Sequence, residues 1–560
     1  AYTHTDNRSQ FLSTAFTETD DLINTNRQQG ILRGHEFRAA FAAKATVKMK
    51  NSSDYYELET NMNYRNKDDD RFNRQQVTGK SAFFTDQYFK NHPDRYQNIW
   101  VQGLYHWAIK QDMRLDATLS YEHRDTRRDQ SLYLLDRLDS PTTEEGDPSD
   151  GMADDEETGL PTFPSEGWRT FGVLPSVADY ERTMDIANSY DSHLDEDYYA
   201  VHPILWWFPK SKGGKWSISL RLPMRVQNRR LHYQRGMVDT TIVRTPFLIS
   251  SEGNYAQWQS NDRKYNVIIQ PLVAASAPAL QHFVDIRDAT DPLNIHLGNN
   301  DLGNTYRYSL RTNVTKTLRE KQILEGVHAE FRYTQNELAM SHLYDPTTGV
   351  HTYQPFSVDG NWHFRSEAVL QLPLDRPKRL FFGTGAALTL VHSVDLTGTT
   401  TLERSTVNTT GWIQEVNLSY KFNGQNNVKL TVTPAWQWFH SRREDFQDFR
   451  TTDIKSTLTA LLALPWKMQL STDLTLYSRR GYKDASMNDT EWCWNARLSR
   501  PFFNGKFLLM LDGFDLLNQL SNITQTINAQ GRTETWTNSL HRYVLLHAAW
   551  RMNHQPKKRN

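Results

Sequence analysis

The chain has 560 residues and a formal net charge of -1 at pH 7. Such a balanced charge produces no global positive field, so a nucleic-acid partner is not expected. The mean hydropathy is -0.71, and no stretch approaches the ~18 consecutive apolar residues of a transmembrane helix, which excludes a helical membrane protein. The single cysteine, Cys493, excludes an intrachain disulfide framework and a cysteine-based zinc site.

Segments in which apolar and polar residues alternate recur along the whole chain. Trp216, Ile218 and Leu220, for example, alternate with serines and an arginine. A period of two places the two sets on opposite faces of a strand. In chain order the pattern predicts about twenty strands, at 7–20, 36–49, 55–66, 98–109, 113–123, 198–209, 215–228, 245–259, 263–275, 303–317, 325–342, 351–375, 380–395, 409–422, 427–441, 447–464, 467–478, 489–501, 506–516 and 539–552.

The second face of nearly every predicted strand is polar and charged, which favours a wet lumen over a second protein core. A closed barrel in lipid needs this arrangement, with apolar residues outside and polar residues inside. An aromatic content of 12% fits the girdles of such a barrel, although an aromatic-rich soluble β-protein that binds glycans is an alternative. The sequence therefore predicts an all-β, closed antiparallel transmembrane β-barrel of about 20–22 strands over residues 1–553, followed by a basic periplasmic tail at 554–560.

The alternation also assigns each side chain to a face of the barrel. The residues expected to face lipid are Trp216, Ile218, Leu220, Leu222, Val428, Leu430, Val432, Leu470, Leu474, Val544, Leu546 and Trp550. Those expected to face the lumen are Arg221, Arg225, Glu415, Lys421, Lys429, Lys467 and Asp473. Pro223 and Pro434 interrupt well-patterned strands, where bulges would accommodate them.

The connections between the predicted strands are of two kinds. Tight turns rich in Gly, Asn and Ser fall at 51–54, 211–214, 423–426 and 503–506, and long polar segments at 67–97, 124–197, 229–244, 276–302 and 517–538. Short and long connections alternate, so we expect the long ones at the extracellular rim and the tight turns at the periplasmic rim. The runs at 351–375 and 380–395 exceed the ~10 residues that span a membrane, and they are expected to project beyond it.

Three groups of loop residues are candidate sites. Carboxylates crowd the stretch 144–157, where calcium binding and a solvated acidic loop are the alternatives. His193, Asp195, Glu196, Asp197 and His202 could bind a metal or could simply be solvated. Aromatic residues of the longest loop would form a ligand-binding surface by stacking on a glycan or peptide; they are Trp168, Phe171, Tyr180 and Tyr190.

No catalytic motif is present. The sequence has no Walker A loop, no GxGxxG after a strand, no GxSxG elbow and no HExxH. We therefore predict neither an enzyme nor a cofactor.

Two segments resemble a known family. Residues 279–302, which end in Gly298-Asn-Asn-Asp-Leu302, resemble the mid-barrel segment of TonB-dependent receptors, and 511–518, 531–535 and 538–546 are similar to the C-terminus of the outer-membrane barrel proteins of Bacteroidota. The resemblance directly covers about a third of the chain. It implies a multi-pass outer-membrane location and a barrel whose N-terminal plug and first hairpin would lie before Ala1.

The resemblance implies a transporter that takes up a large or scarce ligand. The alternative is a non-transporting scaffold barrel in a multi-subunit outer-membrane complex. The expected partners are outer-membrane lipids and lipopolysaccharide, with a surface lipoprotein or neighbouring barrel as further candidates. TonB is expected as a partner only if a plug precedes Ala1, because no TonB box lies within the sequence.

Overall fold

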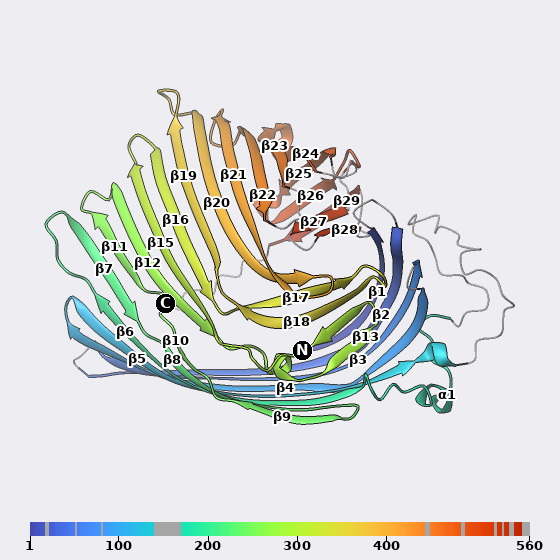
Figure 1. Ribbon diagram of the computed structural model, residues 1–560. Helices are drawn as coiled ribbons and strands as arrows, with labels where there is room; N and C mark the ends of the chain where they lie inside the picture. Colours follow the sequence, from blue (N-terminus) through green and yellow to red (C-terminus); the bar gives the residue numbers. More distant parts are fainter. Residues whose placement is uncertain are drawn as a thin grey trace.

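The fold is described from a computed structural model, which covers residues 1–16, 22–50, 53–79, 82–138, 170–442, 448–482, 488–519, 523–528, 531–536 and 542–551. Most of these residues belong to β-strands (Figure 1). Within the same ranges, no helix combines the length and apolar character that crossing a membrane would require.

Twenty strands of the described chain form the wall of the molecule. They are β1 (Tyr2–Phe16), β2 (Leu22–Lys48), β3 (Tyr55–Gly79), β4 (Phe83–Lys110), β5 (Met113–Leu134), β6 (Tyr190–Trp207), β7 (Gly214–Arg221), β11 (Tyr255–Ser260), β12 (Tyr265–Ser276), β15 (Thr305–Leu318), β16 (Ile323–Gln335), β19 (Asn361–Pro373), β20 (Leu380–Gly398), β21 (Glu403–Lys421), β22 (Asn427–Ser441), β23 (Phe449–Leu464), β24 (Met468–Arg480), β25 (Thr490–Phe502), β26 (Phe507–Phe514) and β29 (Tyr543–Trp550).

The remaining elements are inserted between wall strands. Their bounds are η1 (Leu135–Arg137), α1 (Val177–Glu181), β8 (Met224–Arg235), β9 (Val238–Arg244), β10 (Phe247–Ile249), η2 (Leu280–Phe283), β13 (Arg287–Asp291), β14 (Asn294–Leu297), β17 (Glu337–Asp345), β18 (Val350–Val358), η3 (Pro465–Lys467), η5 (Phe503–Gly505), β27 (Ile523–Asn528) and β28 (Gly531–Trp536).

Successive wall strands pair antiparallel from β1 to β29, as the sequence predicts, and form a closed barrel (Figure 1). Among the described residues, β1 pairs in register with β2, and β29 with β26. Strand β28, which pairs with β27 in a separate hairpin after β26, lies against β1 at the other end of the sheet. Tight connections such as 111–112, 319–322 and 465–467 occupy one rim, called here the short-turn rim. The inserted elements other than η3 and η5 lie toward the other rim, the long-loop rim.

The register places the apolar sets of neighbouring strands on one face. Leu418 pairs with Leu430, Leu430 with Leu458, and Leu458 with Leu474. Leu418, Leu430 and Leu458 are all exposed, so this row faces outward, toward lipid. Lys429 and Asp473 alternate with the row and face the lumen.

The face assignments made from the sequence are confirmed at the wall positions. Two residues lie elsewhere: Leu222 falls between β7 and β8, and Lys467 lies in the turn η3 at the short-turn rim.

The outward apolar belt has a uniform height on neighbouring strands. On β5 it runs from Met113 to Tyr121, and on β6 from Trp207 back to Tyr199, with only apolar or aromatic residues at the outward positions. Each run matches the ~9–11 residues that cross a membrane in a tilted strand. Charged residues occupy the next outward positions, His123 on β5 and Asp197 on β6. The belt therefore ends sharply at these two tyrosines.

Strands β2 to β5 continue far beyond this belt, which corrects two expectations. The segment 67–97 is not a loop, because 67–79 and 83–97 are the extensions of β3 and β4. The run 351–375 is not one projecting strand. It divides at Gly360, which has a φ of 107°, into β18 and the ordinary wall strand β19. The projection beyond the belt is thus built by β2 to β6 together with β8, while the run 380–395 forms the single long strand β20 as expected.

The two prolines are accommodated without the expected bulges. Pro223 lies in the break between β7 and β8, so β6 pairs first with β7 and then with β8. Pro434 remains inside β22, and its pairing with β21 skips residues 414–415 without a change of register. A proline has no amide hydrogen to donate, so the gap coincides with the missing donor.

A charge on the outward face should be far more damaging than the same charge on the lumen face. We predict that Leu430→Arg lowers the free energy of unfolding by about 2–4 kcal/mol, because arginine would lie in hydrocarbon. The matched control, Thr431→Arg on the neighbouring lumen-facing position, should change it by less than about 0.5 kcal/mol. Urea titration in lipid vesicles measures both, and a reversed order would mean that the two faces are exchanged.

Candidate functional site

The mouth of the barrel at the long-loop rim is crossed by the hairpin β17–β18. The hairpin leaves the wall between β16 and β19, which pair directly with each other beneath it. Its tip reaches β2 on another part of the wall, where Asn24 Nδ2 donates to the carbonyl oxygen of Thr348 (3.2 Å). Figure 1 shows both strands of the hairpin running across the opening. The mouth of the barrel is therefore partly covered.

A second hairpin, β13–β14, lies beside the first. Strand β14 pairs in parallel with β18 over Asn294–His296, so the two hairpins share one small sheet. Polar contacts hold β13 against the inner face of the projecting wall. Gln87 Nε2 of β4 donates to the carbonyl oxygen of Thr290 (3.0 Å), and Arg235 of β8 donates to Asp288 Oδ1 (2.8 Å). We call the two hairpins together the mouth cover.

The segment before β13 packs on the inner face of the wall through apolar contacts. Leu280, Phe283 and Val284 are buried against Leu231 and Tyr233 of β8. These two wall residues occupy inward positions, where a lumen lined only by water would favour polar side chains. The apolar patch on β8 thus provides a docking surface for the segment that carries the mouth cover.

The motif Gly298–Leu302 joins the two hairpins. A Cβ at Gly298 would lie 1.7 Å from the carbonyl oxygen of Val284, so only glycine fits at this close approach. The Asn299 amide donates to the His282 carbonyl oxygen (2.7 Å), and its Nδ2 donates to that of Pro355 on β18 (2.9 Å). The motif Gly298–Leu302 therefore links β18 to the segment that precedes β13.

Two histidines meet on the mouth cover. His342 Nε2 and His351 Nδ1 are 2.6 Å apart on the paired strands β17 and β18. Both rings stack on that of Tyr353, and the ring of Tyr344 is tilted against that of His351. Burial and the adjacent His342 lower the pKa of His351 to about 4. A shared hydrogen bond between two neutral imidazoles, one donating and one accepting, is consistent with this spacing at neutral pH.

The lumen wall opposite the projection carries paired charges. Arg311 on β15 and Arg332 on β16 both contact Glu330, at 3.2 and 2.8 Å. The neighbouring strand β19 adds Arg365, which donates to Glu367 (3.2 Å). Arginines outnumber carboxylates here, so the wall offers guanidinium donors that could bind an anionic ligand.

The structure distributes the predicted ligand-binding aromatics over different places. Trp168 lies outside the described residues, as does the acidic stretch 144–157. Tyr180 is buried in an apolar cluster with Tyr88 and Tyr133 on the outer face of the projection, and Phe171 packs at its edge. Tyr190 stacks on Tyr233 inside the wall. The three described residues are not gathered on one surface, and their role in ligand binding stays a prediction.

The histidine and carboxylate group predicted at 193–202 is divided by the period of the strand. His193, Asp195 and Asp197 face outward on β6, whereas Glu196 faces inward and accepts a hydrogen bond from Arg229 (2.7 Å). His202 also faces inward.

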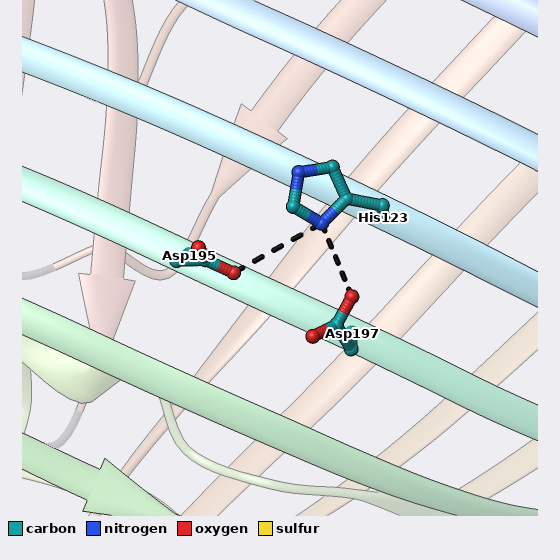
Figure 2. Close-up of side chains that lie close together, drawn as sticks. All are labelled: His123, Asp195 and Asp197. Atoms are coloured by element: carbon teal, nitrogen blue, oxygen red, sulfur yellow. Dashed lines mark hydrogen bonds and ion pairs between the residues drawn. The ribbon is translucent and has the colours of Figure 1, made fainter.

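The outward aspartates are joined by His123 of β5, whose Nδ1 lies 3.1 Å from Asp197 and 3.9 Å from Asp195 (Figure 2). His123 is 74 residues from Asp197 in the sequence, so only strand pairing reveals this grouping.

Comparisons with known proteins found fold-level similarity alone. No protein-family model matches the chain, and no curated protein matches it. Solved structures that resemble it include the copper transporter OprC (TM-score 0.40, 9% identity, 93% of this chain and 75% of that one). Another is BauA, the ferric preacinetobactin receptor from Acinetobacter baumannii (TM-score 0.39, 8% identity, 98% and 80%). A third is the ferric yersiniabactin uptake receptor FyuA from Yersinia pestis (0.37, 9%, 97% and 79%). Similarity this low assigns neither a family nor a ligand.

Acid should release the β13–β14 hairpin. Burial opposes the ionisation of Asp288, but hydrogen bonds from Arg235 and Thr290 outweigh it and lower the pKa to about 2. Ionised Asp288 stabilises the folded hairpin. This stabilisation is complete above the pKa of ~3.9 that the carboxyl group has in the unfolded chain, and it is lost as the pH falls through the pKa in the folded protein. We predict that pepsin cleavage within 277–304, followed by mass spectrometry, rises between pH 4 and pH 2.

The corresponding variant separates this effect from the pH dependence of pepsin. Asp288→Asn should show higher cleavage at pH 4 and no further rise relative to a cleavage site elsewhere in the chain. An unchanged ratio of wild type to variant across this range would contradict the role assigned to the contact between Arg235 and Asp288.

Proposed function

We propose that this chain is an outer-membrane transporter barrel of the receptor type, which takes up a large or scarce ligand. The observation that carries the proposal is the mouth cover. A barrel of about twenty strands encloses a lumen wide enough for an aqueous channel or a plug. A cover over such a lumen is useful to a transporter because it excludes unselected solutes until the ligand is captured.

The mouth cover is attached much more weakly than the wall strands are to each other. Strand β17 pairs with the wall strand β20 at two positions, His342 and Leu343. The tip adds the hydrogen bond between Asn24 and Thr348. Each such bond contributes about 0.5–1.5 kcal/mol net, so opening the cover is far less costly than opening the wall. In this proposal the β17–β18 hairpin is the part of the cover that moves.

In this proposal the long-loop rim is extracellular. The short-turn rim and the tail 554–560 are then periplasmic. The ligand would enter past the mouth cover and meet the arginine-rich wall of β15, β16 and β19. TonB would be a partner only if a plug segment precedes Ala1 in the whole protein.

A scaffold role is the second candidate, and the projection of β2 to β5 favours it. The described segment 170–189, which includes α1, covers part of its outer face through Tyr180, and Ile31 and Phe72 are buried there. A rigid extracellular wall of this kind could dock a surface lipoprotein or a neighbouring barrel. Such docking would not require the mouth cover to open.

Locking the mouth cover distinguishes the two functions. In a Cys493→Ser background, Asn24→Cys and Thr348→Cys would be joined on intact cells by a short bismaleimide. If the protein is a transporter, cells with the cross-linked barrel should take up solutes no better than cells that lack the gene. If it is a scaffold, cross-linking should not change its function. Mass spectrometry of the spent medium, which works with an unidentified ligand, would show which solutes the wild type depletes and the locked variant leaves. Each single-cysteine variant, treated identically, is the control. Equal depletion by locked and unlocked barrels would contradict transport.

A further inference from the structure

An apolar groove of about 560 Å³ lies on the outer face of the barrel, over β4, β5, β6, β8 and β10. Outward side chains of the belt line it, among them Val101, Leu119, Val201 and Phe247. Gly103 lies within it, and a Cβ at that position would meet no atom within 4 Å. The groove is therefore a concave stretch of the surface that faces hydrocarbon, with free space beside Gly103.

The group of His123, Asp195 and Asp197 lies immediately beyond the groove on the same strands. Tyr121 lines the groove and donates a hydrogen bond to Asp197 (2.7 Å), so the apolar and polar parts are in contact. His123 Nδ1 and one carboxylate oxygen of each aspartate lie within 4.8 Å of one another. In Figure 2 the three side chains converge from β5 and β6. The group sits at the level where the belt ends and lipid headgroups begin.

Strand pairing concentrates negative charge at this level. Asp125 is directly opposite Asp195 in the register of β5 and β6, and like charges in that relation repel each other. His193 and Arg127 contact Asp125, Arg230 of β8 is opposite Asp195 on its other side, and Asp195 and Asp197 both face His123. A divalent cation between these carboxylates would remove the repulsion.

The donor set selects the type of cation. One imidazole nitrogen and two carboxylate oxygens suit zinc, which accepts both ligand types, better than calcium or magnesium, which prefer oxygen alone. Three protein ligands leave a fourth tetrahedral position open. An anionic oxygen from the adjoining headgroup region could fill it. Arg127 and Arg230, at outward positions nearby, provide further donors for a phosphate.

We propose that this face holds a phosphorylated lipid, with an acyl chain in the groove and its phosphate on a zinc-type cation bound by His123, Asp195 and Asp197. The location favours a lipid over a protein partner. The groove lies at the level of the hydrocarbon, and the group of His123, Asp195 and Asp197 lies at the level of the headgroups. An amphiphile has this order of apolar and anionic parts. The site is on the outer wall, so it does not depend on the transport function proposed for the lumen.

Native mass spectrometry of the delipidated protein, with lipid A as the probe, tests both halves of the site. The wild type should retain lipid A in the presence of Zn²⁺, and removal of the metal with EDTA should lower retention at least tenfold. Asp195→Asn combined with Asp197→Asn should abolish Zn²⁺ binding by calorimetry and lower lipid retention equally. Gly103→Phe, which fills the groove, should keep Zn²⁺ binding and lose the lipid.

The control is Asp239→Asn, an exposed acid of β9 outside the site, which should change neither measurement. Every variant must show the wild-type heat-dependent shift in electrophoresis, so that misfolding is not mistaken for lost binding. Absence of Zn²⁺ binding by the wild type would overturn the cation site. Lipid A retention that Gly103→Phe leaves unchanged would overturn the groove. A change from dimer to monomer in Gly103→Phe would instead identify the groove as a protein interface and overturn the lipid proposal.

Discussion

The hydrogen-bonding requirement of the backbone in a bilayer determines the rest of this structure. Hydrocarbon offers no partner for an amide, so every strand of the wall must pair on both sides and the sheet must close. Pairing imposes a side-chain period of two, and each strand therefore presents one face to lipid and one to the lumen. The row from Leu418 to Leu474 follows from this constraint. So does the local gap beside Pro434, where the ladder loses a donor and keeps its register.

Beyond the membrane the same strands obey a different rule. Once water is available on both sides, the faces of β2 to β5 are no longer required to be apolar outside and polar inside. Apolar residues accordingly appear on both faces, with Phe72 and Tyr88 outside and Leu231 and Tyr233 inside on β8. Each patch is covered by a connecting segment, 170–189 on the outer face and 277–286 on the inner face. The loops are thus tertiary elements with small cores of their own.

The two kinds of attachment differ in strength, and the difference supports a functional division. Wall strands are joined by long continuous ladders, such as the one between β20 and β21. The mouth cover is joined to the wall by polar contacts, by a two-residue parallel pairing of β17 with β20, and by the apolar segment before β13 that packs on β8. The wall and the mouth cover therefore differ in how continuously their strands are hydrogen-bonded to neighbouring strands.

The sequence by itself determined the features that depend on local periodicity. The strand predicted at 427–441 coincides with β22, Asn427–Ser441, because alternation in a single strand already specifies both faces. The tight turns at 423–426 and 503–506 are predictable for a similar reason, since turn chemistry resides in consecutive residues. The lumen and lipid assignments follow from the same pattern.

Only the tertiary structure decided what lies beyond the belt. The polar segment 67–97 lacks the apolar alternation of a membrane strand, so its sequence predicts a loop, although it extends β3 and β4. The polarity of a strand in water depends on what covers it, which the strand itself does not encode. His123 meets Asp195 and Asp197 through pairing across 74 residues, and the mouth cover assembles from hairpins whose partners are distant in sequence. These sites depend on which segments become neighbours, and that is a property of the closed sheet as a whole.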